Sequence, residues 1–103
     1  KLPRISLLFP SPELNHLVDV RSIETDVFSA FPLREVFLFV NHELADSKTA
    51  PILSSHIVFP LPHLLPPGSH SIKITAHDAV GNKSSWEQII TVVPEERFFT
   101  PLE

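Results

Sequence analysis

The chain has 103 residues, of which 43% are hydrophobic, with eleven prolines, two glycines and no cysteine. This length fits one domain with a two-layer core, and so many prolines favour strands over helices. The net charge of −4, with acids and bases interspersed, argues against nucleic acid as a partner. No stretch is apolar over a length that could cross a bilayer, so we expect no membrane insertion by this chain. Without cysteine there is no disulfide and no thiolate metal site, which fits a cytosolic protein or an exported bacterial one.

The first two predicted strands lie in the N-terminal third of the chain. Residues 1–10 alternate apolar and polar positions between prolines, which predicts an edge strand. Residues 14–28 hold a second strand, but its apolar residues change parity, so that Val20 lies on one face and Ile23 on the other. Either a bulge near Ser22 shifts the register or the strand ends there, and we favour the bulge.

Residues 34–40 are the most apolar segment and predict the third strand. Phe37 and Phe39 occupy one face while aliphatic residues occupy the other, which favours a central strand. Asn41 and His42 follow directly. Both residue types tolerate a positive φ, so we expect a two-residue hairpin turn at this point.

The next three segments complete the middle of the domain. Residues 43–50 are polar and predict a short edge strand followed by a loop. Alternation returns over residues 52–61, with Ile57 and Phe59 on the same face. Residues 62–68 are rich in proline and predict a crossover that carries the chain to the other sheet.

The C-terminal segments predict a hairpin. The positions expected to face the core alternate with polar ones and are Ile72, Ile74, Ala76, Ile90 and Val92. The outward positions of the returning strand include Ile89 and Val93. Between the strands, Asp78 can start a type I turn, and Gly81 can adopt the positive φ that closes it.

The sequence of this hairpin carries a family resemblance. The stretch Gly68-Ser-His70-Ser-Ile-Lys-Ile-Thr-Ala76-His-Asp78-Ala-Val-Gly81-Asn82-Lys-Ser84 resembles the last hairpin of bacterial immunoglobulin-like repeats. Those repeats share the pattern G-x-H-x-ϕ-x-ϕ-x-A-x-D-x-x-G-N-x-S, where ϕ is apolar. The matched residues are turn formers and core positions, and the family has no active site. The resemblance therefore implies a structural module of an exported multidomain bacterial protein.

Together the segments predict an all-β domain, a two-sheet antiparallel immunoglobulin-like β-sandwich of about seven strands. The alternation of apolar and polar residues does not distinguish an immunoglobulin-like strand topology from a fibronectin-like one. We expect the sandwich to span residues 1–94 and a linker or tail to occupy residues 95–103, of which residues 102–103 are consistent with a cloning scar. Because the chain contains no methionine, even at its start, we expect it to be a piece of a longer protein.

The sequence contains no nucleophile elbow, phosphate loop or glycine-rich cofactor turn, and we expect no catalytic residue, no cofactor and no metal site. His70 and His77 are predicted to point to opposite faces of one strand, so they cannot share a metal ion. We expect His70 to hold the crossover to the strand by a side-chain hydrogen bond. For Asp78, a turn-forming role is favoured over calcium binding. The other histidines are scattered over separate elements: His16, His42, His56 and His63.

These features predict a non-catalytic module that acts as a spacer, positions other domains or takes part in adhesion, outside the cell or on its surface. Its expected partners are neighbouring domains of the same chain, and other proteins or a polysaccharide. The alternative is a carbohydrate-binding accessory domain of a secreted hydrolase, with Trp86, Phe37 and Phe39 as candidate stacking rings. We favour the interpretation that these rings cover the core or a neighbouring domain. A third interpretation is a domain that lines the active site of an adjacent enzyme.

Overall fold

The computed structural model describes residues 2–10, 20–52 and 54–93, and these contain seven strands. The strands are β1 (Arg4–Phe9), β2 (Ser22–Phe28), β3 (Leu33–Val40), β4 (Glu43–Thr49), β5 (His56–Pro60), β6 (Gly68–Asp78) and β7 (Lys83–Val92). Within the described ranges there is no helix of a length and apolarity that could cross a membrane.

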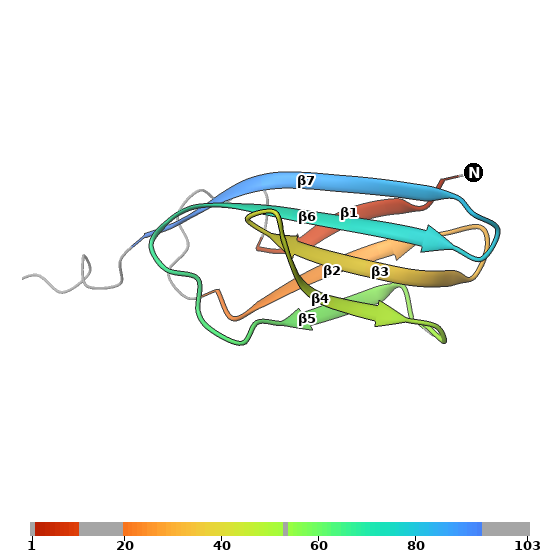
Figure 1. Cartoon of the computed structure of the whole chain (residues 1–103), viewed down its shortest axis with the longest axis horizontal. Coiled ribbons are helices and arrows are strands. Elements are labelled where there is room, and N and C mark those ends of the chain that lie inside the picture. The colour runs from red at the N-terminus through yellow and green to blue at the C-terminus, as the bar shows by residue number, and fades with distance from the viewer. Residues whose placement is uncertain (1, 11–19, 53, 94–103) are drawn as a thin grey trace, which may run out of the picture.

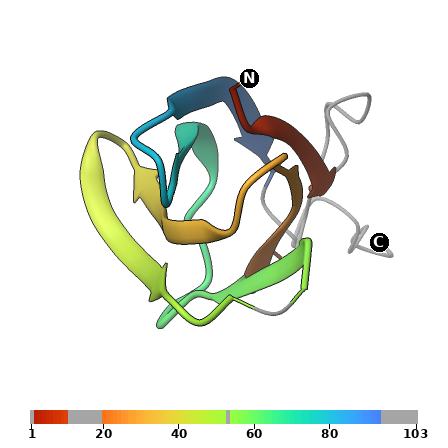
Figure 2. The ribbon, with the colours of Figure 1, turned by 90° about the vertical axis from the view of Figure 1, so that its right-hand side faces the viewer.

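The strands form two antiparallel sheets, with the orders β1-β2-β5 and β4-β3-β6-β7 (Figure 1). The view along the strands in Figure 2 shows the two layers enclosing a common interior. The predicted seven-stranded, all-β sandwich is therefore confirmed. The partner of β4 is β3, whereas in constant-type immunoglobulin domains the fourth strand joins the sheet of the first, second and fifth.

Alternate residues of each strand fill the space between the sheets. All the positions of the last hairpin that were predicted to face the core are buried: Ile72, Ile74, Ala76, Ile90 and Val92. The other strands add Ile23, Val27, Val36, Leu38 and Phe59. Val93 was predicted to face outward but is only 8% exposed. It follows the last residue of β7, and the alternation of a strand no longer decides where its side chain points.

Neither the bulge predicted near Ser22 nor its alternative, that the strand ends there, matches the structure. β2 begins at Ser22, and its pairing with β5 shows no shift in register. The extra residue is in β1, where Leu7 and Phe9 pair with consecutive residues of β2 and Leu8 bulges between them. A bulge reverses the alternation of side chains, and as a result both Leu7 and Pro10 are buried. β4 carries a similar bulge opposite β3.

β5 begins four residues later than predicted. Its start coincides with a hydrogen bond from the N–H of His56 to Oγ of Ser54 (3.1 Å), a local contact that competes with strand pairing. Ile57 and Phe59 are buried as expected. Two predicted strand segments lie outside the described residues: residues 14–19 and Leu53.

The turn between β3 and β4 is the predicted two-residue hairpin. Asn41 and His42 have φ angles of 52° and 72°, which are both in the left-handed region. β3 lies between β4 and β6 and is thus a central strand, while β4 is an edge strand, as predicted.

His70 anchors the crossover that leads into β6, which confirms its predicted role. The ring is buried, and Nε2 donates a hydrogen bond to the carbonyl of Pro66 at 2.6 Å. In immunoglobulin domains a tyrosine near the start of the sixth strand makes a comparable bond to the backbone a few residues upstream. His70 therefore makes a hydrogen bond like the one that the tyrosine makes in the tyrosine corner.

The chain enters and leaves the sandwich at opposite ends (Figure 1). The entry end contains the start of β1, the β2–β3 loop and the β6–β7 turn, and the exit end contains the β3–β4 turn, the crossover and the end of β7. Oγ of Ser84 donates to the carbonyl of Pro3 at 2.6 Å, which ties the entering chain to β7. The 11 residues of β6 give the sandwich a length of about 36 Å.

Candidate functional site

The titratable residues are dispersed over the fold. In the described part of the chain, no group of three or more histidine, aspartate or glutamate residues is arranged to hold a metal ion. His70 points into the interior and His77 outward, as predicted. His56, on the outer face of the three-stranded sheet, lies 3.4 Å from Oε1 of Glu24 and 3.5 Å from Oδ1 of Asp26. His42 lies in the β3–β4 turn, His63 in the crossover and His16 outside the described residues. That the domain has no metal, cofactor or catalytic residue stays a prediction.

Asp78 organises the turn between β6 and β7, as the sequence predicts. Its Oδ1 accepts hydrogen bonds from the N–H groups of Val80 (3.0 Å) and Asn82 (2.8 Å), and its Oδ2 accepts one from Nδ2 of Asn82 (2.7 Å). Burial acts to raise the pKa of the Asp78 carboxyl, but these three hydrogen bonds outweigh it and hold the pKa below its usual value. Gly81, at φ 95°, completes the turn.

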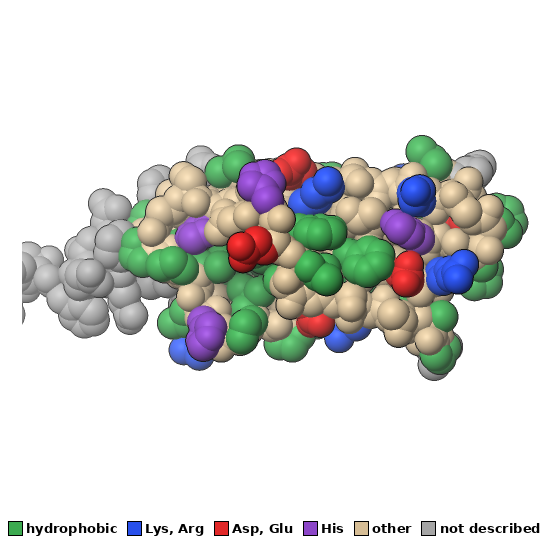
Figure 3. Space-filling model, in the orientation of Figure 1, with side chains coloured by type: hydrophobic (Ala, Val, Ile, Leu, Met, Phe, Trp, Pro, Cys, Tyr) green, Lys and Arg blue, Asp and Glu red, His purple; other side chains and the backbone are tan. Residues whose placement is uncertain are grey.

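The outer face of the four-stranded sheet carries a shallow groove of about 600 Å³ across β3, β6 and β7, here called the outer groove. Figure 3 shows this face, with hydrophobic side chains near its centre and both basic and acidic side chains, as well as histidines, around them. Strand pairing arranges the outer groove and its margins in three rows, an uncharged middle row and a charged row on each side. The middle row is Phe37, Thr75 and Ser85, and the flanking rows are Phe39, Lys73 and Glu87, and Glu35, His77 and Lys83.

The aromatic residues of the outer groove contact one another without being coplanar. The ring centroids of Phe37 and Phe39 are 6.5 Å apart, and the ring planes are inclined by 46°. The ring of His77 meets Phe37 edge-on at 5.5 Å, and Nδ1 of His77 lies 3.6 Å from Oε1 of Glu35. Nζ of Lys73 lies 5.9 Å from the centroid of Phe39, within the range of a cation–π contact.

Trp86 does not belong to this surface. It lies on the inward face of β7, opposite Ile74, and packs against the core. The three candidate stacking rings are therefore separated: Phe37 and Phe39 point outward and are half-buried, and Trp86 covers the core.

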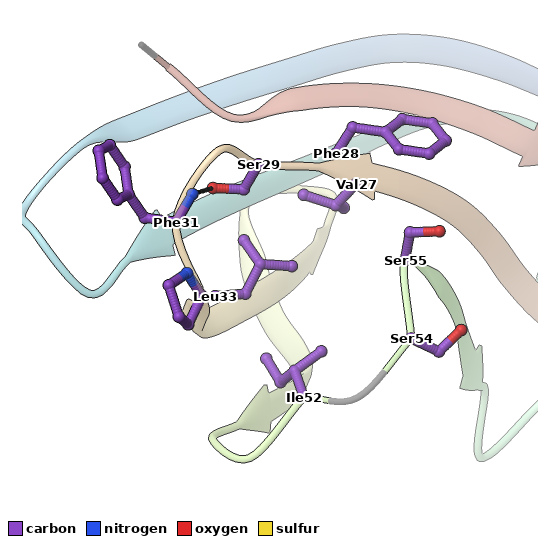
Figure 4. A pocket seen from close by; sticks show the side chains of 9 residues that line it. Val27, Phe28, Ser29, Phe31, Leu33, Ile52, Ser54 and Ser55 are labelled. Atoms are coloured by element: carbon purple, nitrogen blue, oxygen red, sulfur yellow. Dashed lines mark hydrogen bonds between the residues drawn. The ribbon is translucent and has the colours of Figure 1, made fainter.

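The entry end contains a second hollow, of about 240 Å³ (Figure 4). Val27, Leu33 and Ile52 point toward it, while the rings of Phe28 and Phe31 point away into solvent. The N–H of Phe31 donates to Oγ of Ser29 at 3.3 Å, which shapes the β2–β3 loop beside the hollow. The hollow is apolar in its depth and has no charged side chain among its lining residues.

Sequence reasoning identified the two phenylalanines of the outer groove but missed Lys73, Thr75, His77 and Lys83. Alternation already places these residues on outward faces. What it does not reveal is that β6 lies between β3 and β7, and only this strand order brings the lysines beside the phenylalanine rings.

The two antiparallel sheets define a β-sandwich domain of the immunoglobulin-like or fibronectin-like class. No protein-family model and no curated protein matches the chain.

Solved structures with a similar fold include three proteins of low sequence identity. The chain is similar to fibronectin(III)-like modules of Clostridium thermocellum CbhA, with 17% identity over 88% of this chain and 98% of that chain and a TM-score of 0.64. It is similar to CopC from Methylosinus trichosporium OB3b, with 15% identity over 97% of this chain and 100% of that chain and a TM-score of 0.59. It is also similar to a Jonesia denitrificans lytic polysaccharide monooxygenase, with 17% identity over 84% of this chain and 60% of that chain and a TM-score of 0.53. These likenesses establish the fold alone.

Proposed function

We propose that this domain is a non-catalytic module that spaces and positions neighbouring domains of a larger, exported or cell-surface protein. The observation that carries the proposal is the entry and exit of the chain at opposite ends of the sandwich (Figure 1). A module with this geometry separates the domains on either side by about 36 Å, the length of its longest strand. The fold it shares with fibronectin(III)-like modules, and the resemblance of its last hairpin to bacterial immunoglobulin-like repeats, support the same role and an exported location.

The entry end has the surface that contact with a neighbouring domain requires. Four apolar side chains at this end are between 41% and 65% exposed: Leu2, Phe28, Phe31 and Val80. Exposed apolar residues that gather in one place mark interaction surfaces, and contacts between domains of one chain are of this kind. In this proposal residues 1–94 are the module and residues 95–103 connect it to the next domain.

Mechanical unfolding of single molecules tests the proposed spacer role. When the domain is pulled from its two ends, β1 and β7 are drawn along their own axes in opposite directions. Many hydrogen bonds of the sheets must then break together, so we expect one cooperative event at high force. The released chain between Arg4 and Val92 should lengthen the molecule by roughly 280 Å.

The matched control applies the force at the same end of the sandwich. Because the chain has no cysteine, Leu2→Cys and Ala30→Cys provide two unique attachment points at the entry end. Pulling there peels β1 from β2 one pair at a time, which should need a clearly lower force. An end-to-end unfolding force no higher than this peeling force would refute the spacer role.

A carbohydrate-binding accessory role is the second candidate, and one observation favours it. Phe37 and Phe39 lie side by side on the outer face of a sheet, beside hydroxyl side chains that suit hydrogen bonding to a sugar. The inclination of 46° between the rings argues against a flat polysaccharide surface, which needs coplanar rings, and favours a single chain. Binding of an acidic oligosaccharide and of its neutral ester, measured by NMR, tests this role together with the charge of its ligand.

A further inference from the structure

We infer that the outer groove binds a single polysaccharide chain that carries carboxylate groups, as a polymer of uronic acids does. The inference rests on the second candidate function and specifies its ligand. It is independent of the spacer role, which depends on the two ends of the sandwich.

The charge of the outer groove differs in sign from that of the whole chain. The chain has a net charge of −4, yet the charged or titratable side chains lining the groove are Lys73, Lys83 and His77. The carboxylates of Glu35 and Glu87 keep their negative charge, but they stand at the margin and not among the residues that line the groove. Glu35 lies against His77, and Oε2 of Glu87 accepts a hydrogen bond from Oγ of Ser71 at 2.7 Å. An anionic ligand is therefore favoured over a neutral or cationic one.

The middle row favours a sugar as the carrier of that charge. The ring of Phe37 offers an apolar face to the C–H groups of a sugar, and Thr75 and Ser85 offer hydroxyls that can both donate and accept. Their two oxygens are 3.4 Å apart, so they present one joint hydrogen-bonding site. A lysine then stands on each side of this row, at positions 73 and 83.

An acidic peptide fits this surface less well. Extended peptides gain most of their affinity by adding a strand to an open sheet edge. β3 and β6 are both interior strands of their sheet, and the open edge of β7 lies at the side of the sheet, not on the face that carries the outer groove. A peptide lying in the outer groove could therefore form no main-chain ladder with them.

The test compares two forms of one polymer on the whole chain. Oligogalacturonate carries a carboxylate on each unit, and its methyl-esterified form has the same backbone without the charge. We expect oligogalacturonate to shift the amide NMR signals of β3, β6 and β7, with an affinity at least about five-fold higher than that of the ester. This difference should shrink at high salt, because the lysines of the outer groove are accessible to solvent ions.

Charge-neutralising variants locate the site. Lys73→Gln and Lys83→Gln should each weaken binding by about two- to five-fold, the range for an exposed ion pair. Glu35→Gln should strengthen binding, since it removes a negative charge from the margin. The matched control is Arg4→Gln, which changes the net charge equally but lies beside Phe28 on the other sheet, and it should leave the affinity unchanged. The thermal midpoint of each variant verifies that it is folded.

The remaining outcomes decide between the inference, the carbohydrate-binding role and the spacer role. Equal binding of the ester would overturn the inference but leave a carbohydrate-binding role intact. Equal binding of polyglutamate would show that the surface recognises negative charge on any polymer, and this would also overturn the inference. No binding of either sugar polymer would overturn both the inference and the second candidate function, while the spacer role would still depend on its own pulling experiment.

Discussion

The side-chain amide of Asn41 faces the ring of His70, with Nδ2 3.0 Å from Nδ1, although the two residues are 29 positions apart. Oδ1 of the same amide accepts a hydrogen bond from the N–H of Ser71 at 3.0 Å, which determines which end of the amide meets the ring. The NH₂ group can only donate, so Nδ1 must accept, and Nε2 carries the proton that it donates to Pro66. A neutral ring with its proton on Nε2 satisfies all three contacts. The β3–β4 turn, β6 and the crossover are thereby held together at the exit end.

The first prediction concerns this ring. Nitrogen NMR of the folded protein at neutral pH should show His70 with an unprotonated Nδ1 and a protonated Nε2. His70→Phe should lower the free energy of unfolding by about 1–3 kcal/mol, because it leaves the Asn41 amide and the Pro66 carbonyl without their partner. His63→Phe, at an exposed position of the crossover, is the control and should change stability by less than about 0.5 kcal/mol. Equal effects of the two substitutions would contradict the role of His70.

The second prediction concerns the φ of 95° at Gly81. Gly81→Val should cost about 1–3 kcal/mol in chemical denaturation, because a β-branched residue resists a positive φ. A Cβ at this position would meet no atom within 4 Å, so the cost comes from the backbone alone. Gly81→Asn should cost less, since asparagine tolerates this region better. An asparagine variant as unstable as the valine variant would indicate a cause other than φ.

The third prediction uses two isoleucines of the same hairpin. Ile74 is fully buried, and Ile89 is 59% exposed on the outer face. Ile74→Ala should cost about 2–5 kcal/mol because it removes apolar contacts and leaves a cavity, whereas Ile89→Ala should cost less than about 0.5 kcal/mol. If urea denaturation gave the reverse order, the assignment of the two faces would be wrong.

The fourth prediction is the pH dependence that Asp78 causes. Its pKa is lower in the folded protein than in the unfolded chain, so in acid the unfolded chain binds more protons. The stabilisation is complete well above the unfolded value of about 3.9 and is lost as the pH falls through this value toward the lowered folded pKa. Asp78→Asn should be less stable at pH 7, because its NH₂ group would meet Nδ2 of Asn82. Thermal midpoints of the two proteins should converge below about pH 4, and a constant difference down to pH 2 would contradict the prediction.

Local features of the fold were predictable from the sequence because they depend on neighbouring residues. Alternation assigned the faces of β6 and β7, and the tolerance of Asn41 and Gly81 for positive φ located both hairpin turns. The bulge near Ser22 was predicted wrongly for a related reason. A change of parity between Val20 and Ile23 reveals that the inward side switches, but a strand that begins at Ser22 produces the same change as a bulge.

Long-range features were not predictable in the same way. The sequence does not specify which strands become neighbours, so neither the pairing of β4 with β3 nor the outer groove could be deduced from it. The bond between Asn41 and His70 illustrates the limit. The sequence predicted that Asn41 forms part of the β3–β4 turn and that His70 holds the crossover. Their contact with each other depends on the folded chain, in which the turn and the crossover lie side by side.

The bulges at Leu8 in β1 and Ala45 in β4 have a consequence for copies of this domain that stand close together. A straight, uninterrupted edge strand presents a row of free N–H and C=O groups on which another chain can build a continuous sheet, the first step toward fibrous aggregates. An extra residue twists the strand and breaks the spacing of that row. Each sheet therefore has one edge, β1 in the first and β4 in the second, that accepts a foreign strand poorly.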